Sequence, residues 1–218
     1  MVLYRTTMLY PVTAQFGILD KRTEHWKRVI YKFATIPKVA NNKKPAFVFA
    51  HFLVPHDPYV FNEDGTFLTR QIGEQRSRTR KFVDQVKFLN KKIKKLVDEI
   101  LSKSEIPPII IIQSDEGSYP NRWLSIVDRT KLTNDEFKQK MGILNAIYLP
   151  NNDKKMMYVS MTPVNTFRII FNSLFKTHLK ILPDNNYIID DDTPWKTVMS
   201  ASAHGDLGAS GSGTVHLK

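Results

Sequence analysis

The sequence predicts an α/β fold with a mostly parallel sheet flanked by helices, and three neighbouring segments carry this prediction. Residues 46–54 and 109–112 are short apolar runs rich in β-branched and aromatic residues, which is typical of strands buried on both faces. A long amphipathic stretch at 82–101 lies between them. Strand, helix and strand in this order form a βαβ crossover, in which the two strands run parallel.

The helical segments are predicted from their apolar spacing. Residues 22–33 place Trp26, Val29, Ile30 and Phe33 on one face, which indicates a short amphipathic helix. In the segment 82–101 the apolar residues also form one stripe, and most of the lysines lie off it. Thr162 and Pro163 predict the start of another helix, with the threonine as its cap and the proline in the first turn.

The expected strands end at turn signals. The run at 46–54 stops at two prolines, Pro55 and Pro58, which cannot donate to a strand ladder. The run at 109–112 follows a Pro-Pro pair and stops before a Ser-Asp-Glu-Gly turn. A third apolar segment, 143–149, ends at Pro150 and adds a further strand.

Composition is that of an ordinary globular protein. The chain has 218 residues, 42% of them hydrophobic and 24% charged, which suits a single domain with a real core. There is no cysteine, so disulfides, thiolate metal sites and cysteine nucleophiles are excluded. We expect one domain over residues 1–195, followed by a flexible Gly/Ser-rich tail over 196–218.

Positive charge is concentrated in one stretch. The formal net charge is +11, and residues 70–103 hold eleven Lys and Arg against four Asp and Glu. Such a segment can meet nucleic acid, anionic lipid or an anionic substrate. It can equally be the solvated face of a helix that covers a sheet.

Polar side chains lie where two of the expected strands end. His51 lies within the first run and His56 just beyond it, whereas Asp115 and Glu116 follow the second. In an open parallel sheet, ligands bind at the carboxyl ends of the strands. The two carboxylates suit oxygen coordination of a divalent cation, or they form a simple turn. His56 has the chemistry of a metal ligand, an acid or an oxyanion donor, and His51 that of a ligand or a core histidine.

Four blocks of the chain resemble a known set of motifs. Residues 45–59 read PAFVFAHFLVPHDPY and are similar to the FxxxHxxxPHxPY segment of bacterial sulfatase-like proteins of the alkaline phosphatase superfamily. Residues 109–117, IIIIQSDEG, resemble the metal-site segment IIIQSDHG of the same proteins. Residues 143–150, ILNAIYLP, and 162–172, TPVNTFRIIFN, resemble two later blocks. The blocks occur in the family's order, and the resemblance covers about residues 5–195.

The resemblance implies a fold, a chemistry and roles for individual residues. Sulfatase-like domains are α/β structures that bind one or two divalent cations and cleave or transfer sulfate or phosphate esters. Asp115 would be a metal ligand, and Glu116 stands where the family usually has a histidine ligand, which favours Mg, Mn or Ca over Zn. His56 and His51 would be the catalytic histidines that contact the transferred group or the leaving oxygen.

The four blocks match the C-terminal part of such a domain, and the family's nucleophile lies upstream of them. We therefore expect a sulfatase-like hydrolase or transferase portion with an incomplete N-terminal half that is inactive alone. The expected partner is a sulfate or phosphate ester, with anionic lipid as a further partner, whereas nucleic acid is not expected. By analogy the full-length protein would be membrane-associated or extracytoplasmic, with an upstream membrane segment. The alternative is a non-catalytic domain that binds anionic surfaces through its basic helix.

Overall fold

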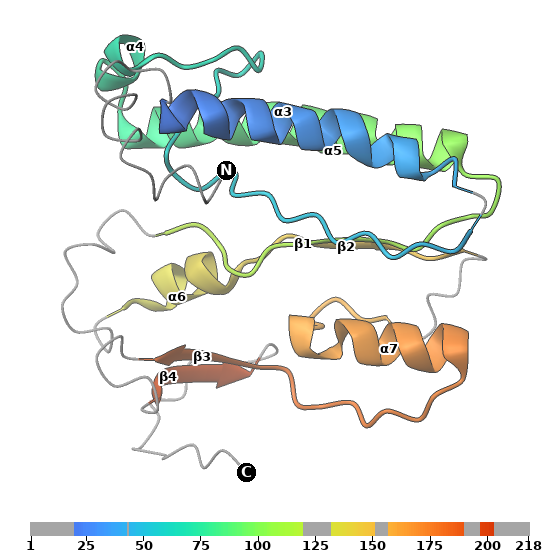
Figure 1. The fold of residues 1–218 in the computed structure, drawn as a ribbon. Coiled ribbons are helices and arrows are strands. Elements are labelled where there is room, and N and C mark those ends of the chain that lie inside the picture. Colours follow the sequence, from blue (N-terminus) through green and yellow to red (C-terminus); the bar gives the residue numbers. More distant parts are fainter. Residues whose placement is uncertain (1–19, 43, 120–131, 151–156, 190–196, 203–218) are drawn as a thin grey trace, which may run out of the picture. The chain divides into compact units, whose positions relative to one another are not determined.

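The computed structural model describes residues 20–42, 44–119, 132–150, 157–189 and 197–202 (Figure 1). It divides into two compact units, Met1–Pro107 and Pro108–Lys218, which are described separately. Helices and short antiparallel strand pairs occur together, so the fold is a mixed α and β structure. The single domain expected over residues 1–195 stays a prediction. No described helix is both long enough and apolar enough to span a bilayer.

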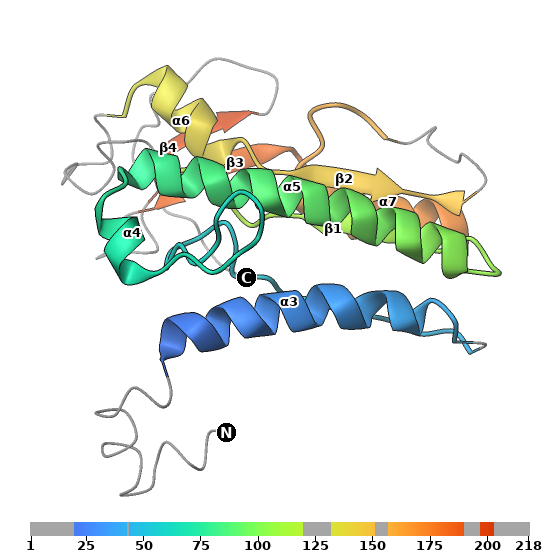
Figure 2. The ribbon, with the colours of Figure 1, turned by 90° about the horizontal axis from the view of Figure 1, so that it is seen from above.

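Unit 1 contains three described helices, α3 (Lys21–Val39), α4 (Arg70–Glu74) and α5 (Arg78–Lys103). The helices expected at 22–33 and 82–101 are confirmed and are longer at both ends. The backbone N–H groups at their starts are capped by side chains, since Asp20 accepts hydrogen bonds at the start of α3 and Ser77 at the start of α5. Helices α3 and α5 pack on each other, and Figure 2 shows both along their length.

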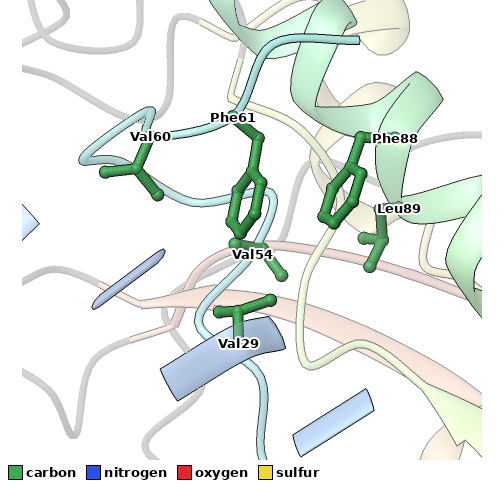
Figure 3. Packing of buried hydrophobic residues seen from close by; sticks show 6 residues of the cluster. All are labelled: Val29, Val54, Val60, Phe61, Phe88 and Leu89. Atoms are coloured by element: carbon green, nitrogen blue, oxygen red, sulfur yellow. The ribbon is translucent and has the colours of Figure 1, made fainter. Parts of the chain in front are cut away.

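The core of unit 1 lies between these helices and the 54–68 loop. Its buried members are Val29, Val54, Val60, Phe61, Phe88 and Leu89 (Figure 3). The rings of Phe61 and Phe88 are stacked, with 4.2 Å between centroids and 11° between planes. Trp26 closes one side of this core by packing against Phe61 and donating its indole N–H to the carbonyl of Gly65 at 3.0 Å. The apolar stripe of α5 therefore packs on a loop and a helix, within the residues described for unit 1.

The expected strand at 46–54 is not present. The segment belongs to no strand, and Phe47 and Phe49 are 83% and 82% exposed. A strand exists only where a neighbouring strand accepts and donates its hydrogen bonds, and the described part of unit 1 contains no strand that could do so. The predicted parallel βαβ crossover is consequently not observed among the described residues, and the parallel part of the fold prediction is not shown.

The described residues of unit 2 form two antiparallel strand pairs and two helices. Strand β1 (Ile110–Gln113) pairs with β2 (Asn145–Tyr148), with Ile111 opposite Ile147. Between them in the chain lies α6 (Asn134–Met141), whose start carries a capping box formed by Thr133 and Glu136. The strands expected at 109–112 and 143–149 are thus confirmed, but they run antiparallel.

The other elements described in unit 2 are α7 (Pro163–Phe175), β3 (Asn185–Ile189) and β4 (Thr197–Ser202). The helix expected after Thr162 and Pro163 is confirmed. Strands β3 and β4 pair antiparallel, so residues 197–202 of the predicted tail form a strand. The remainder of that predicted tail, 203–218, lies outside the described residues.

Candidate functional site

The corner at residues 55–59 is held in place by hydrogen bonds from the side chain of Gln85, on α5. The Gln85 side chain is fully buried, and its amide donates to the carbonyls of Pro55 and His56, both at 3.1 Å. Its oxygen accepts from the backbone N–H groups of Val60 at 2.9 Å and Phe61 at 3.3 Å. One side chain thus satisfies four backbone groups of the corner and of the chain that follows it.

Arg22 of α3 holds the other end of the same loop. Its guanidinium donates to the carbonyl of Tyr59 at 2.9 Å and to that of Leu68 at 2.8 Å. The peptide bonds before Pro55 and Pro58 are both cis. The backbone of the Pro-His-Asp-Pro corner is therefore tied to both long helices of unit 1.

The His56 side chain projects from this fixed corner into solvent. Its imidazole is 59% exposed and lies 2.6 Å from the carbonyl of Asp57 and 2.9 Å from the Asp57 carboxylate. When a neighbouring carboxylate holds one ring nitrogen of a histidine, the orientation of the ring is fixed, and the other ring nitrogen faces away and is free to contact a ligand. Both contacts use Nδ1, so the outward Nε2 of His56 can donate a hydrogen bond to an incoming oxyanion when the ring is in its imidazolium form.

His51 lies on the unpaired segment and does not join a core. It is exposed, and its carbonyl oxygen accepts a hydrogen bond from the Lys32 ammonium. The alternative of a buried core histidine is therefore wrong. Nothing in the described contacts brings the His51 ring to His56, so its predicted catalytic role stays a prediction.

A hollow of about 430 Å³ lies beside the 61–67 turn. Three cationic side chains line it, Arg76, Arg80 and Lys91, and three carboxylates oppose them, Glu63, Asp64 and Asp84. Asp84 is buried and pairs with Arg76 at 3.0 Å and with Arg80 at 2.9 Å. Because the charges balance within the hollow, it does not favour an anionic ligand.

In unit 2 the predicted metal segment follows β1 directly. The Asp115 carboxylate is exposed and accepts the backbone N–H of Glu116 at 3.0 Å. The Glu116 carboxylate forms an ion pair with the ammonium of Lys140, on α6. Asp115 and Glu116 are thus adjacent, but they are engaged in different local contacts.

These contacts do not make a metal centre by themselves. A divalent cation takes several oxygen or nitrogen ligands, and the described residues contain no group of three or more His, Cys, Asp or Glu that could hold one. An ammonium group beside Glu116 also repels a second cation at that carboxylate. Within the described residues of unit 2, Asp115 and Glu116 lack the further ligands that a divalent cation needs, and metal binding at these two residues stays a prediction.

The predicted site residues fall into two groups. His51 and His56 belong to unit 1, whereas Asp115 and Glu116 belong to unit 2, and the structure defines the surroundings of each group within its own unit. Gln85 and Lys140 were not among the predicted site residues. Gln85 could have been found because it interrupts the apolar stripe of α5. Lys140 carries a weaker signal, three residues after the buried Phe137 on α6.

The basic helix α5 is partly neutralised within unit 1. Lys87 and Lys91 both reach Glu63, at 3.0 Å and 3.7 Å. Lys95 and Lys103 both reach Glu99, at 3.8 Å and 3.0 Å. These exposed pairs are weak, but they lower the charge that the helix presents to a partner.

Comparison of the chain with protein-family models, with curated proteins and with solved structures finds no match in any of the three.

Proposed function

We propose that this chain is the C-terminal portion of a sulfatase-like hydrolase or transferase that acts on sulfate or phosphate esters. The observation that carries the proposal is the geometry of the Pro-His-Asp-Pro corner. Its backbone is fixed by Gln85 and Arg22, and the His56 imidazole is left pointing outward. The order of the four resembling blocks supports the same function.

His56 has the central role in this proposal. In its imidazolium form, its outward ring nitrogen donates a hydrogen bond to an oxygen of the bound ester, where negative charge accumulates as the ester is attacked. A fixed backbone matters here because a donor that is already in place needs no reorganisation during the reaction. His51, five residues earlier in the same block, is the second proposed contact.

The proposal keeps Asp115 as a ligand for a divalent cation, Mn, Mg, Ca or Zn, which would polarise the ester and draw charge from its oxygens. No step attributed to this chain depends on that ion. The four blocks contain no residue that matches the family's nucleophile, so we do not expect turnover by the chain alone. The appropriate test is therefore binding of the anion.

Isothermal titration of the chain with inorganic phosphate and with sulfate, with and without MnCl₂, tests the proposal. We expect His56→Gln to weaken anion binding by about tenfold, which corresponds to the loss of one charge-assisted hydrogen bond. Asp115→Asn should remove any effect of Mn²⁺ on that binding. His178→Gln is the matched control, since His178 is exposed and lies outside the four blocks. Equal binding by wild type and His56→Gln, or no anion binding at all, would overturn the proposal.

Binding of anionic surfaces through α5 remains a prediction of the sequence, and the ion pairs to Glu63 and Glu99 do not favour it. Flotation with phosphatidylserine vesicles over a salt series would test it. Strong vesicle binding at low salt that vanishes near physiological salt would support binding of anionic surfaces through α5.

A further inference from the structure

The turn that follows β1 is built against the C-terminal end of α6. The backbone N–H of Ser114 donates to the carbonyl of Leu144 at 2.9 Å, and the Ser114 hydroxyl accepts from the N–H of Leu144 at 2.9 Å. Two residues after Asp115, the N–H of Gly117 donates to the carbonyl of Lys140 at 2.7 Å. The acidic segment is consequently anchored on both sides of Asp115 and Glu116.

Gly117 shows how close this approach is. A Cβ atom added there would lie 2.2 Å from the carbonyl oxygen of Gln139 and 2.8 Å from that of Lys140. Because these are backbone atoms, they cannot move aside without distorting the end of α6. The turn therefore has little freedom to swing Glu116 away from the helix.

Lys140 places a positive charge inside this contact. The residue is only 7% exposed, and its ammonium pairs with the carboxylate of Glu116. The same ammonium lies 3.6 Å from the centre of the Tyr119 ring, in a cation–π contact. It also belongs to the last turn of α6, where the helix dipole favours a cation. A buried ammonium is expensive unless it is paired in this way.

We propose that Lys140 is a positioning residue that acts as the built-in cation of the Asp115–Glu116 turn, so that Glu116 is not a metal ligand. Its ammonium neutralises Glu116 and fixes the turn that presents Asp115 to solvent. This inference rests on the proposed function in one respect, namely that a divalent cation is expected at this turn. Lys140 takes the place of that cation at Glu116. Folding of the turn thus requires no metal ion.

The test uses the chain with Glu116→Gln, Lys140→Met and the double variant. The first readout is the affinity for Mn²⁺, measured by water-proton relaxation. We expect Glu116→Gln to change that affinity by less than twofold, because the carboxylate is occupied by Lys140. A loss of tenfold or more in Glu116→Gln would show that Glu116 does coordinate the metal, and would overturn the inference.

The second readout is the thermal midpoint, which is informative even where Mn²⁺ does not bind. Each single variant should lower the midpoint by at least about 4 °C, and EDTA should leave the wild-type midpoint unchanged. The double variant should lose less than the two single variants together, because the two side chains contact each other and each single variant already removes that contact. Lys138→Met is the control, since Lys138 is exposed on the same helix.

A Lys140→Met midpoint equal to that of Lys138→Met, or a wild-type midpoint that falls with EDTA, would contradict the inference. These outcomes are separable from failure of the proposed function. The function fails when His56→Gln binds anions as wild type does, whereas the inference depends on the midpoints and on the effect of Glu116→Gln.

Discussion

Gln85 donates a hydrogen bond from its buried side-chain amide to the carbonyl of His56, 29 residues earlier in the chain. This bond joins the middle of α5 to the corner that carries the candidate oxyanion donor. The position of His56 therefore depends on Gln85, a residue with a neutral side chain that does not ionise. Replacing Gln85 therefore tests how the corner is held without touching the imidazole.

Gln85→Leu should lower the free energy of unfolding by about 2–4 kcal/mol, because two buried and two partly buried backbone groups lose their partner and the apolar replacement satisfies none of them. Urea unfolding followed by circular dichroism measures the change. Gln71→Leu, at an exposed position of α4, should shift stability by no more than about 0.5 kcal/mol. Equal losses in the two variants would mean that Gln85 does not hold the corner.

Gly65→Ala should destabilise unit 1 by more than about 1 kcal/mol. Gly65 has a φ of 90°, and an added Cβ would lie 2.6 Å from the Phe88 ring, which is stacked on Phe61. Gly73→Ala, within α4, is a matched control. A Cβ atom added there would meet only side-chain atoms, at 3.7 Å or more. That control should be neutral or stabilising by about 0.5–1 kcal/mol. The thermal midpoints of the two variants should move in opposite directions or differ clearly.

The stability of unit 1 should depend on pH through His25. Burial lowers the pKa of the His25 imidazole, and the cationic side chains of Arg28 and Lys32 lower it further. The folded state then binds a proton less readily than the unfolded state. The stability contributed by neutral His25 is thus present above about pH 6.5 and is lost as the pH falls from there through the lowered pKa.

Thermal midpoints measured between pH 5 and pH 8 test this dependence on His25. His25→Leu should flatten the decline below about pH 6.5, whereas His178→Gln should leave the decline as it is in the wild type. An unchanged slope in His25→Leu would refute the role of His25.

Asp184 should stabilise the start of α7. Its carboxylate accepts from the backbone N–H of Thr162 at 2.8 Å, from the Thr162 hydroxyl at 2.6 Å and from the Asn165 amide at 3.0 Å. Burial alone would raise the pKa of Asp184, but hydrogen bonds from Thr162, Tyr158 and Asn165 outweigh it, so that the pKa is lowered. The carboxylate serves as a helix cap supplied from 22 residues away.

Asp184→Asn should lower the free energy of unfolding by about 1–3 kcal/mol at neutral pH. Because the folded-state pKa lies below the unfolded one, this contribution exists above about pH 4 and disappears as the pH falls through the lowered pKa. Urea unfolding at pH 7 and at pH 3 should show the difference between wild type and variant shrinking at the lower pH. Asp98→Asn, at an exposed position of α5, is the control and should show no such change.

At the start of α7, the local sequence correctly predicted the helix but not the hydrogen bonds that Thr162 makes there. Thr162 and Pro163 correctly predicted a helix start, because proline fits the first turn and threonine favours the residue before it. The Thr162 side chain, however, does not cap the helix itself. Its hydroxyl donates to Asp184, a partner that no local pattern reveals.

The sequence by itself determined that helices form at 22–33, at 82–101 and after Thr162, and that strands form at 109–112 and 143–149, because each is encoded by apolar spacing and end signals within its own residues. The exact ends of these elements came from the structure. The sequence also placed the Pro-His-Asp-Pro corner and the acidic turn directly after their segments. It did not determine strand direction, since an apolar run reads the same whether its neighbour is parallel or antiparallel.

The tertiary structure alone decided which groups meet across long stretches of chain. It left residues 46–54 without a partner strand, paired Glu116 with Lys140, and fixed the carbonyl of His56 on Gln85. A buried polar side chain is stabilised by whichever groups the fold brings to it, and those groups lie 24 and 29 residues away in the last two cases. Periodicity describes a residue's own element, whereas pairing depends on the contacts between elements.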